Sequence, residues 1–360
     1  FRRVLFRSIL CTIFYTYHII PICLNILIYS TNINYKEVFD LKKGYVYIIL
    51  TTLFFSSMEI SLKTVTNDFN PLQITLSRFF VGGLVLLPFA VKRLRALSLS
   101  ITKSDLKYFA FLGFMCVVVS MSLYQLAVLN TKASVVAVLF SCNPVFVMLL
   151  AYLILKEKIY RHNVISLILE VLGIIVIINP LHTKLTLSGI FLTLSSAIIF
   201  SMYTVFGKRK TLKFGGIVVT CFSFIFGSLE MLILVLLTKI NFIADILNKN
   251  KLHVFANIPI FSGYTLHNMP IMIYVFVFVT GVGYALYFMA MEATSTSLTS
   301  LVFFFKPVIS PILALLILKE IIPINMVVGI LLIVIGSIIS IIPTIITQMH
   351  NKHVEALYKE

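Results

Sequence analysis

Long apolar stretches dominate this 360-residue chain and constrain its fold more than any other feature. A helix that crosses a lipid bilayer needs about 20 mostly apolar residues. Ten such stretches follow residue 40, at 44–66, 71–91, 105–128, 131–155, 160–179, 185–206, 214–238, 270–291, 296–318 and 323–345. Because backbone polar groups in lipid must pair within their own segment, these stretches predict spanning helices. We therefore expect an all-α polytopic membrane protein with ten transmembrane helices and one long loop, at 239–269.

The composition excludes several classes of protein. Hydrophobic residues make up 60% of the chain and charged residues 12%, whereas a soluble domain is roughly 45–50% apolar and about 25% charged. A soluble enzyme, a disordered chain and a secreted disulfide scaffold are therefore excluded. The five cysteines lie in apolar runs without paired spacing and are interpreted as core residues. The net charge of +16 does not indicate nucleic-acid binding, because most cations lie in short loops between apolar stretches.

The positions of Lys and Arg predict how the chain is oriented, since cytoplasmic loops carry an excess of both. If residues 41–43 are cytoplasmic, that side holds seventeen Lys and Arg and the other side six. We expect a plasma-membrane protein with both ends of the ten-helix body in the cytoplasm, and a cytoplasmic tail at 346–360. Residues 1–40 contain another apolar run and are kept apart as an N-terminal extension. For this extension, a further segment and a removable signal both stay open.

The chain repeats itself at a distance of 163 residues, without a gap from Tyr124 to Pro180. A second shift, of 145 residues, aligns the first and sixth stretches. We therefore predict two repeats, 41–180 and 181–345, of five helices each. Because five is odd, the second repeat enters the membrane from the opposite face, an arrangement typical of secondary transporters. The aligned groups include Asn143-Pro144-Val145 with Lys306-Pro307-Val308, Leu153–Glu157 with Leu316–Glu320, and Lys63 with Lys208.

This duplicated signature resembles the EamA family of the drug/metabolite transporter superfamily. The resemblance covers residues 41–345 and includes Lys63 at the end of the first span, followed by Pro71 and Arg78 at the start of the second. The tryptophan usual in the family's first span is absent, and Phe54-Phe55-Ser56-Ser57 stands there instead. The resemblance implies ten helices, two inverted repeats and transport of small organic solutes, often outward. It does not name a substrate.

Lys306 is the leading candidate for substrate binding, because ionisable groups within the bilayer are costly and mark function. It lies near the middle of the ninth span, directly before Pro307. Pro144 and Pro307 predict helix kinks that expose backbone carbonyls to a central cavity. We expect Lys306 to bind a substrate carboxylate or phosphate. The alternative is that it pairs with an intramembrane glutamate and fixes packing. Asn143, its counterpart, would add uncharged hydrogen bonds.

Glu59, Lys63 and Arg78 are predicted to form a cluster that couples or gates transport. Glu59 and Lys63 are four residues apart, so they share one helix face. Arg78 enters the second span at a similar depth. One interpretation is an outer gate or a structural ion-pair network. The other is a protonatable Glu59 that couples transport to a proton gradient, since burial and nearby cations shift a carboxylate pKa in opposite directions.

Other glutamates and tyrosines complete the set of candidates. Glu170 and Glu230 fall within spans and would either pair with Lys306 or contact the substrate. Glu157 and Glu320 lie at helix ends, where they would cap the following turn or pair across the repeat interface. The tyrosines would line the cavity, with packing in the core as the alternative. They are Tyr124, Tyr203, Tyr284 and Tyr287.

These features favour a secondary transporter that exports small organic metabolites or drugs by alternating access, with Lys306 at the midplane. The first alternative is a cation or drug exporter that uses Glu59 or Glu230. The second is a non-transporting scaffold or sensor, and an intramembrane enzyme is disfavoured because no metal-type histidine spacing or phosphate loop occurs. The expected partners are a small-molecule substrate and the lipid bilayer. Neither a cofactor nor nucleic acid is expected, and proton coupling and a homodimer are left open.

Overall fold

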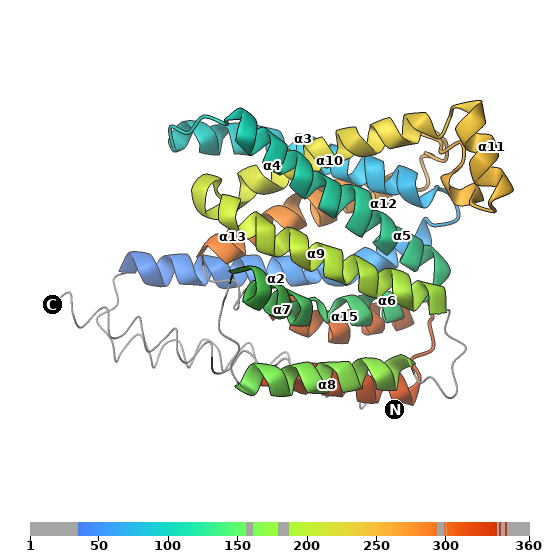
Figure 1. Ribbon diagram of the computed structural model, residues 1–360. Helices are drawn as coiled ribbons and strands as arrows, with labels where there is room; N and C mark the ends of the chain where they lie inside the picture. Colours follow the sequence, from blue (N-terminus) through green and yellow to red (C-terminus); the bar gives the residue numbers. More distant parts are fainter. Residues whose placement is uncertain are drawn as a thin grey trace.

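The structure, a computed structural model, describes residues 35–155, 161–178, 187–293, 299, 301–336, 338–339 and 343. Within these residues the regular secondary structure is helical and contains no β-strand, which confirms the all-α class (Figure 1). The long helices share one main direction, as the spans of a membrane protein do.

The helices follow one another with short connections. The first half of the chain forms α2 (Tyr35–Thr64), α3 (Pro71–Ala96), α4 (Lys103–Gly113), the π-helix η1 (Phe114–Ser120), α5 (Met121–Asn130), α6 (Ala133–Phe140), α7 (Asn143–Leu155) and α8 (Arg161–Ile178). The second half forms α9 (Leu187–Phe214), α10 (Gly216–Leu237), α11 (Asn241–Lys249), the 3-10 helix η2 (His253–Phe255), α12 (Met269–Ile273), the π-helix η3 (Tyr274–Gly283), α13 (Tyr284–Ala293) and α15 (Leu301–Ile317). A further apolar helix spans Ile324–Gly336.

Seven helices in the described residues are long and apolar enough to cross a membrane. They are Lys43–Thr64, Pro71–Ala96, Lys103–Asn130, Ala133–Ile154, Leu187–Phe214, Gly216–Leu237 and Met269–Ala293. Three shorter apolar helices, Val164–Ile177, Phe305–Ile317 and Ile324–Gly336, lie where the fifth, ninth and tenth spans are predicted. The chain is thus a multi-pass membrane protein, whereas the count of ten spanning helices stays a prediction.

Local sequence determines where the helices begin. At the start of α3, the Asn70 side chain accepts a hydrogen bond from the backbone N–H of Leu72 at 2.9 Å. At the start of α4, Thr102 and Asp105 form a capping box, in which each side chain accepts from the other residue's backbone N–H. Asp105 also binds Lys210 at the end of α9, 2.5 Å away. The cap therefore joins two helices at the same end of the bundle.

Helix α8 and helix Ile324–Gly336, which occupy equivalent places in the two repeats, cross in close contact. A Cβ on Gly173 would lie 2.8 Å from the carbonyl oxygen of Gly329, and a Cβ on Gly336 would lie 3.0 Å from that of Ser166. Residue numbers rise along one helix as they fall along the other, so the two helices run antiparallel. The 163-residue shift maps each contact onto the other, as an inverted repeat requires. Small residues permit this close approach.

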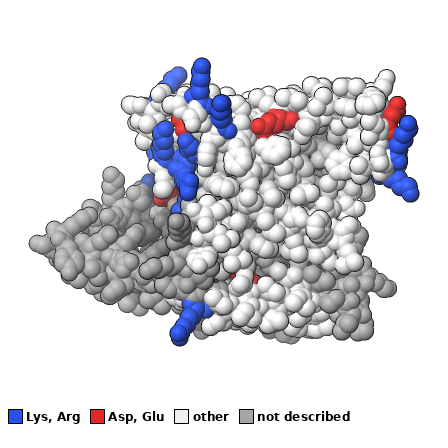
Figure 2. Space-filling view, viewed as in Figure 1, with Lys and Arg blue, Asp and Glu red and all other residues white. Residues whose placement is uncertain are grey.

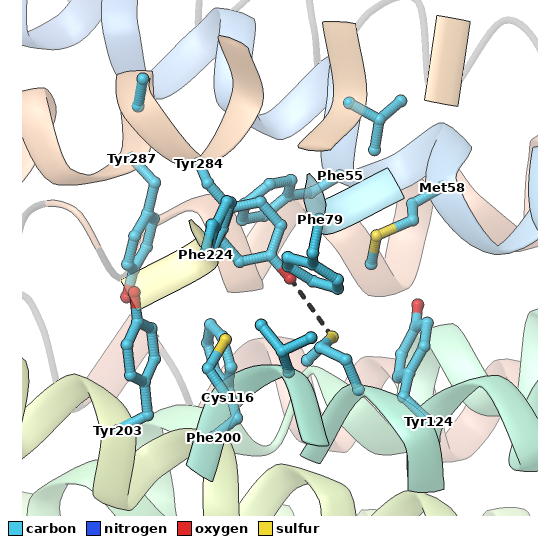
Figure 3. Packing of buried hydrophobic residues seen from close by; sticks show 14 of the residues in the cluster. Phe55, Met58, Phe79, Cys116, Tyr124, Phe200, Tyr203, Phe224, Tyr284 and Tyr287 are labelled. Carbon is cyan, nitrogen blue, oxygen red and sulfur yellow. Dashed lines mark hydrogen bonds between the residues drawn. The ribbon is translucent and has the colours of Figure 1, made fainter. Parts of the chain in front are cut away.

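The spans 103–130 and 269–293 each contain a π-helical segment that we did not predict. Segment η1 ends at Ser120 and η3 ends at Gly283, and these two positions are equivalent under the 163-residue shift. The next residues, Met121 and Tyr284, are in contact, because the Tyr284 hydroxyl donates to Met121 Sδ at 3.4 Å (Figure 3). In repeats related by a two-fold axis, equivalent residues touch each other only near that axis. We therefore place the pseudo-two-fold axis of the repeats at this contact.

Aromatic side chains fill the space around this axis (Figure 3). The rings of Phe79 and Phe224 meet edge to face with centroids 4.6 Å apart, and Phe55 and Tyr284 lie 4.8 Å apart. Tilted and edge-to-face contacts of this kind stabilise aromatic clusters beyond their burial alone. The cluster joins α2, α3, α10 and α13, and so connects the two repeats.

Some predicted segments differ from the structure or lie outside it. The region 239–269, expected as one loop, contains α11 and η2. Helix α2 begins at Tyr35, so the last residues assigned to the N-terminal extension belong to the first helix. The rest of that extension (1–34), Glu157 and the expected tail (346–360) lie outside the described residues.

Candidate functional site

Lys306 is buried in α15 and contacts the first repeat. Its Nζ lies 2.5 Å from Oε1 of Glu59 in α2, and the two side chains are 1% and 0% exposed. Tyr124 of α5 donates a hydrogen bond to the same carboxylate oxygen. The ring centroid of Phe140, in α6, lies 5.0 Å from Nζ, and that of Tyr124 lies 5.9 Å from it. An aromatic face at this distance attracts an ammonium group. One side chain of the second repeat therefore contacts three helices of the first.

The ion-pair partner of Lys306 is Glu59, rather than Glu170 or Glu230, the two glutamates named from the sequence. A buried ion pair is costly to open, because removing one partner leaves the other charge without compensation. Glu59 therefore balances the charge of Lys306, although Nζ makes no hydrogen bond within the described residues.

Arg78 of α3 is also fully buried. Its Nη1 donates to the Met58 thioether at 3.6 Å, and its Cζ lies 4.6 Å from the ring centroid of Phe79. Across the described part of the chain, Nε and Nη2 of Arg78 have no hydrogen-bond partner. Glu59 is near enough to attract the guanidinium electrostatically, but no hydrogen bond joins the two side chains there.

These three charged groups do not balance. The Lys306–Glu59 pair is neutral overall whichever group holds the proton, whereas an arginine remains protonated in proteins. The centre therefore has one excess positive charge, on Arg78. A buried charge without compensation is unfavourable. The electrostatics of the centre consequently favour an added anion over an added cation.

Lys63 takes part in a different set of contacts from the one predicted. Its Nζ donates to the carbonyl oxygens of Val128 (2.7 Å) and Thr131 (2.8 Å), at the end of α5. A cation at a helix C-terminus is stabilised by the exposed carbonyls and the helix dipole. No ion pair or hydrogen bond among the described residues joins Lys63 to Glu59 or Arg78. The expected cluster of these three residues is thus divided between two sites.

Glu320 lies beside Lys63 and connects the two repeats. Its carboxylate accepts hydrogen bonds from the backbone N–H groups of Ala133 (2.9 Å) and Ser134 (3.2 Å), and from the Ser134 hydroxyl (2.5 Å). It therefore caps the N-terminus of α6 in the first repeat, where a negative charge is favourable. This matches the expectation of pairing across the repeat interface. We call Glu320, Lys63, Ala133 and Ser134 the Glu320 latch.

Asn143 binds the helix that is equivalent to α2. Its Nδ2 donates to the Ala197 carbonyl at 3.1 Å and to the Ser201 hydroxyl at 2.8 Å, both in α9. The helix is interrupted between α6 and α7, just before Pro144, whereas α15 continues through Pro307. The two prolines are thus placed differently, although the sequence around them repeats.

Tyr203 and Tyr287 point toward one another from facing helices (Figure 3). The Tyr203 hydroxyl lies 3.2 Å from the Ser223 hydroxyl, and the Phe288 ring is edge-on to both tyrosines at 5.9 and 5.5 Å. These contacts are compatible with both interpretations of the tyrosines, as core packing and as the wall of a binding site.

Glu170 and Glu230 lie in α8 and α10, outside the Lys306–Glu59 ion pair. Glu170 is buried in α8 and accepts a hydrogen bond from Ser166, one turn earlier, at 3.0 Å. Glu230 is partly buried in α10. In the structure, therefore, neither residue is the ion-pair partner of Lys306.

We did not identify Met58, Met121 or Ser201 from the sequence. The two methionines accept hydrogen bonds from Arg78 and Tyr284, but a methionine in an apolar helix carries no sequence signal. Ser201 could have been found, because the 145-residue shift aligns it with Ser56 in the first span.

Comparison with known proteins agrees with this architecture. The sequence profile described as the EamA-like transporter family matches residues 42–179 and 187–342. A Clostridium kluyveri protein named "Uncharacterized transporter" is 40% identical over 308 residues, which is 83% of this chain and 93% of that protein. A Methanothermobacter thermautotrophicus protein of the same name is 22% identical over 293 residues, 77% of this chain and 80% of that protein.

The fold has a counterpart among solved structures. A protein crystal structure with 15% sequence identity superposes with a TM-score of 0.59 over 83% of this chain and 96% of that one. This likeness concerns the fold alone. The two family matches cover both predicted repeats, and they confirm the resemblance noted from the sequence. The chain belongs to the EamA-like transporter family.

Proposed function

We propose that this transporter is a secondary exporter of small organic metabolites that carry an anionic group, and that it works by alternating access between its two repeats. The observation that carries this proposal is the buried centre formed by Lys306, Glu59 and Arg78, which connects the repeats and has an excess positive charge. Inverted repeats commonly hold the substrate near the midplane where they meet.

In this proposal Lys306 separates from Glu59 and then binds the anionic group of the solute, such as an amino-acid carboxylate. The exchange replaces one carboxylate with another, so Lys306 is paired before and after it. It also removes a direct link between α15 of the second repeat and α2 of the first. Substrate binding would thereby loosen the repeat interface, which alternating access requires. Proton transfer to Glu59 during the exchange would couple transport to a proton gradient.

A cation or drug exporter that uses Glu59 or Glu230 is the second candidate. It is supported by Glu59 Oε2, which lacks a hydrogen-bond partner within the described residues. The excess charge on Arg78 disfavours it, because a cationic solute would be repelled. A scaffold or sensor would be expected to pair all its interior charges, and the open nitrogens of Arg78 disfavour that function.

We further propose a plasma-membrane location with both ends of the ten-helix body in the cytoplasm. On the face drawn in Figure 2, most of the visible Lys and Arg gather at one end, where α3 ends, α4 begins and α9 ends. An excess of this kind marks the cytoplasmic side. Single cysteines at Lys103 and Lys251, labelled in intact cells with an impermeant thiol reagent, test the orientation: labelling at position 103 rather than 251 would overturn it.

Transport is tested with purified protein in proteoliposomes and a panel of labelled carboxylates, phosphates, neutral solutes and amines. We expect flux of at least one anionic class, and Lys306→Gln should abolish it while Lys249→Gln, an exposed residue of α11, leaves it unchanged. Flux of amines alone would favour the cation exporter. Absence of flux for every class, with folded protein, would contradict transport.

A further inference from the structure

The arrangement of hydrogen-bond donors around Arg78 indicates what the centre binds. A guanidinium has two edges, and the edge formed by Nε and Nη2 presents two parallel N–H groups that match the two oxygens of a carboxylate. In Arg78 this whole edge is without a partner in the part of the chain that the structure describes. The one hydrogen bond recorded for the group uses Nη1, on the other side.

The neighbours of Arg78 do not satisfy this edge. Met58 supplies a thioether, which is a weak acceptor, and Phe79 supplies an aromatic face. Tyr124 and Tyr284 interact with it electrostatically, but their hydroxyl groups donate hydrogen bonds to Glu59 and to Met121 instead. A fully buried arginine with two open donors on one edge is rare, because the loss of hydration is not repaid.

Lys306 differs from Arg78 because it already has a carboxylate partner. That carboxylate lies 2.5 Å from Nζ and balances its charge, even though Nζ makes no hydrogen bond within the described residues. Arg78 is joined to no carboxylate in the same part of the chain. It is therefore the cation of this centre whose charge is still open to an anion while the Lys306–Glu59 pair is intact.

We propose that the Nε–Nη2 edge of Arg78 is the docking site for the carboxylate of the transported solute. This inference rests on the proposed function and makes it more specific, since it selects a planar carboxylate and assigns first contact to Arg78. The carboxylate completes the charge of the centre and satisfies both open donors in a bidentate pair. At a later step Glu59 separates from Lys306, and Lys306 then binds the solute.

Binding to the purified full-length chain in nanodiscs tests the proposal. The probes are benzoate and glutamate, with benzamide as the analogue of benzoate that lacks the carboxylate, and phenyl phosphate as a tetrahedral anion. We expect at least one carboxylate to raise the thermal stability in a saturable manner. Arg78→Lys keeps the charge but loses the planar edge, and should weaken carboxylate binding roughly tenfold or more. Arg95→Lys is the matched control, because Arg95 is exposed in the last turn of the same helix.

Several results would overturn the assignment. These are carboxylate affinity unchanged in Arg78→Lys, binding of benzamide as tight as that of benzoate, tighter binding of phenyl phosphate, or no binding of either carboxylate. If the variant does not fold, wild-type protein labelled with ¹⁵N-arginine gives the answer, because benzoate should shift the Nε–H resonance of the buried guanidinium, and an unshifted resonance contradicts docking. Carboxylate binding without flux in proteoliposomes would instead contradict the transport function and leave the docking site intact.

Discussion

The Glu320 latch gives a prediction whose size follows from its contacts. Substitution of Glu320 by Gln removes the charge but nearly preserves the shape of the side chain. The carboxylate accepts three hydrogen bonds, at 2.9, 3.2 and 2.5 Å, from Ala133 and Ser134. A hydrogen bond to a charged group contributes about 1.5–3 kcal/mol, against about 0.5–1.5 kcal/mol between neutral groups. An anion at a helix N-terminus adds about 0.3–1 kcal/mol.

Glu320 is only partly buried, so the loss should lie at the low end of these values, at about 1–2 kcal/mol. Because the latch joins the repeats, we expect this energy to be lost from a conformation in which that end of the transporter is closed. A change of about 1.4 kcal/mol shifts the equilibrium between closed and open forms about tenfold. The variant should therefore open at this end more often, although its helices remain folded.

Accessibility of a cysteine beneath the latch measures this opening. Thr131 is 8% exposed and adjoins the latch, so Thr131→Cys should react slowly with a maleimide when Glu320 is present. We expect the reaction to be about tenfold faster in the Glu320→Gln background. Protein without Thr131→Cys corrects for native cysteines. Glu292→Gln, which disrupts an ion pair with half-exposed Arg93, serves as the matched control. Reduced thermal stability without faster labelling would refute the gating argument and leave a structural contact.

Three further predictions follow from single contacts. Tyr124→Phe removes the hydroxyl that donates to Glu59 and should lower the free energy of unfolding by about 1–2 kcal/mol in denaturant titrations, and an unchanged value would contradict the contact. Gly173→Val places a Cβ 2.8 Å from a backbone oxygen of the facing helix and should cost about 1–3 kcal/mol, whereas wild-type stability would show that the helices do not cross there. Asp105→Ala removes a capping box and the ion pair with Lys210 and should lower the free energy of unfolding by about 1 kcal/mol. Asp105→Asn, which retains capping, should lower it less.

The sequence was sufficient to predict the seven long apolar helices, because a run of apolar residues has few other structures available in lipid. It also identified Lys306 as buried, since a lysine within an apolar run has no nearby loop in which to remain hydrated. The partner of Lys306 could not be derived in the same way. Glu59, Glu170 and Glu230 all satisfy the criterion of an acidic residue within a span, and only the packing of α15 against α2 distinguishes them.

The cluster of Glu59, Lys63 and Arg78 shows a second limit of sequence reasoning. Helical spacing places Glu59 and Lys63 on one face, but it does not say which groups lie opposite each of them. Lys63 lies near the end of α2, where the free carbonyls of α5 attract its long side chain. The π-helical segments could not be predicted from the sequence either, because in a uniformly apolar run no polar residue marks the change of helical period.

The two repeats share their framework but not their charges, and this asymmetry bears on mechanism. Under the shifts of 145 and 163 residues, Arg78 corresponds to Ser223, Glu59 to Thr204 and Lys306 to Asn143. The contacts themselves are repeated: Met58 accepts a hydrogen bond from Arg78, and Tyr203, its counterpart, lies 3.2 Å from Ser223. Three uncharged residues thus stand where the centre has its charges. The symmetric framework supplies two equivalent ways to pack the helices. The charges lie on one side of the pseudo-axis, so in the alternating-access cycle that we propose the two conformations would surround the bound group differently.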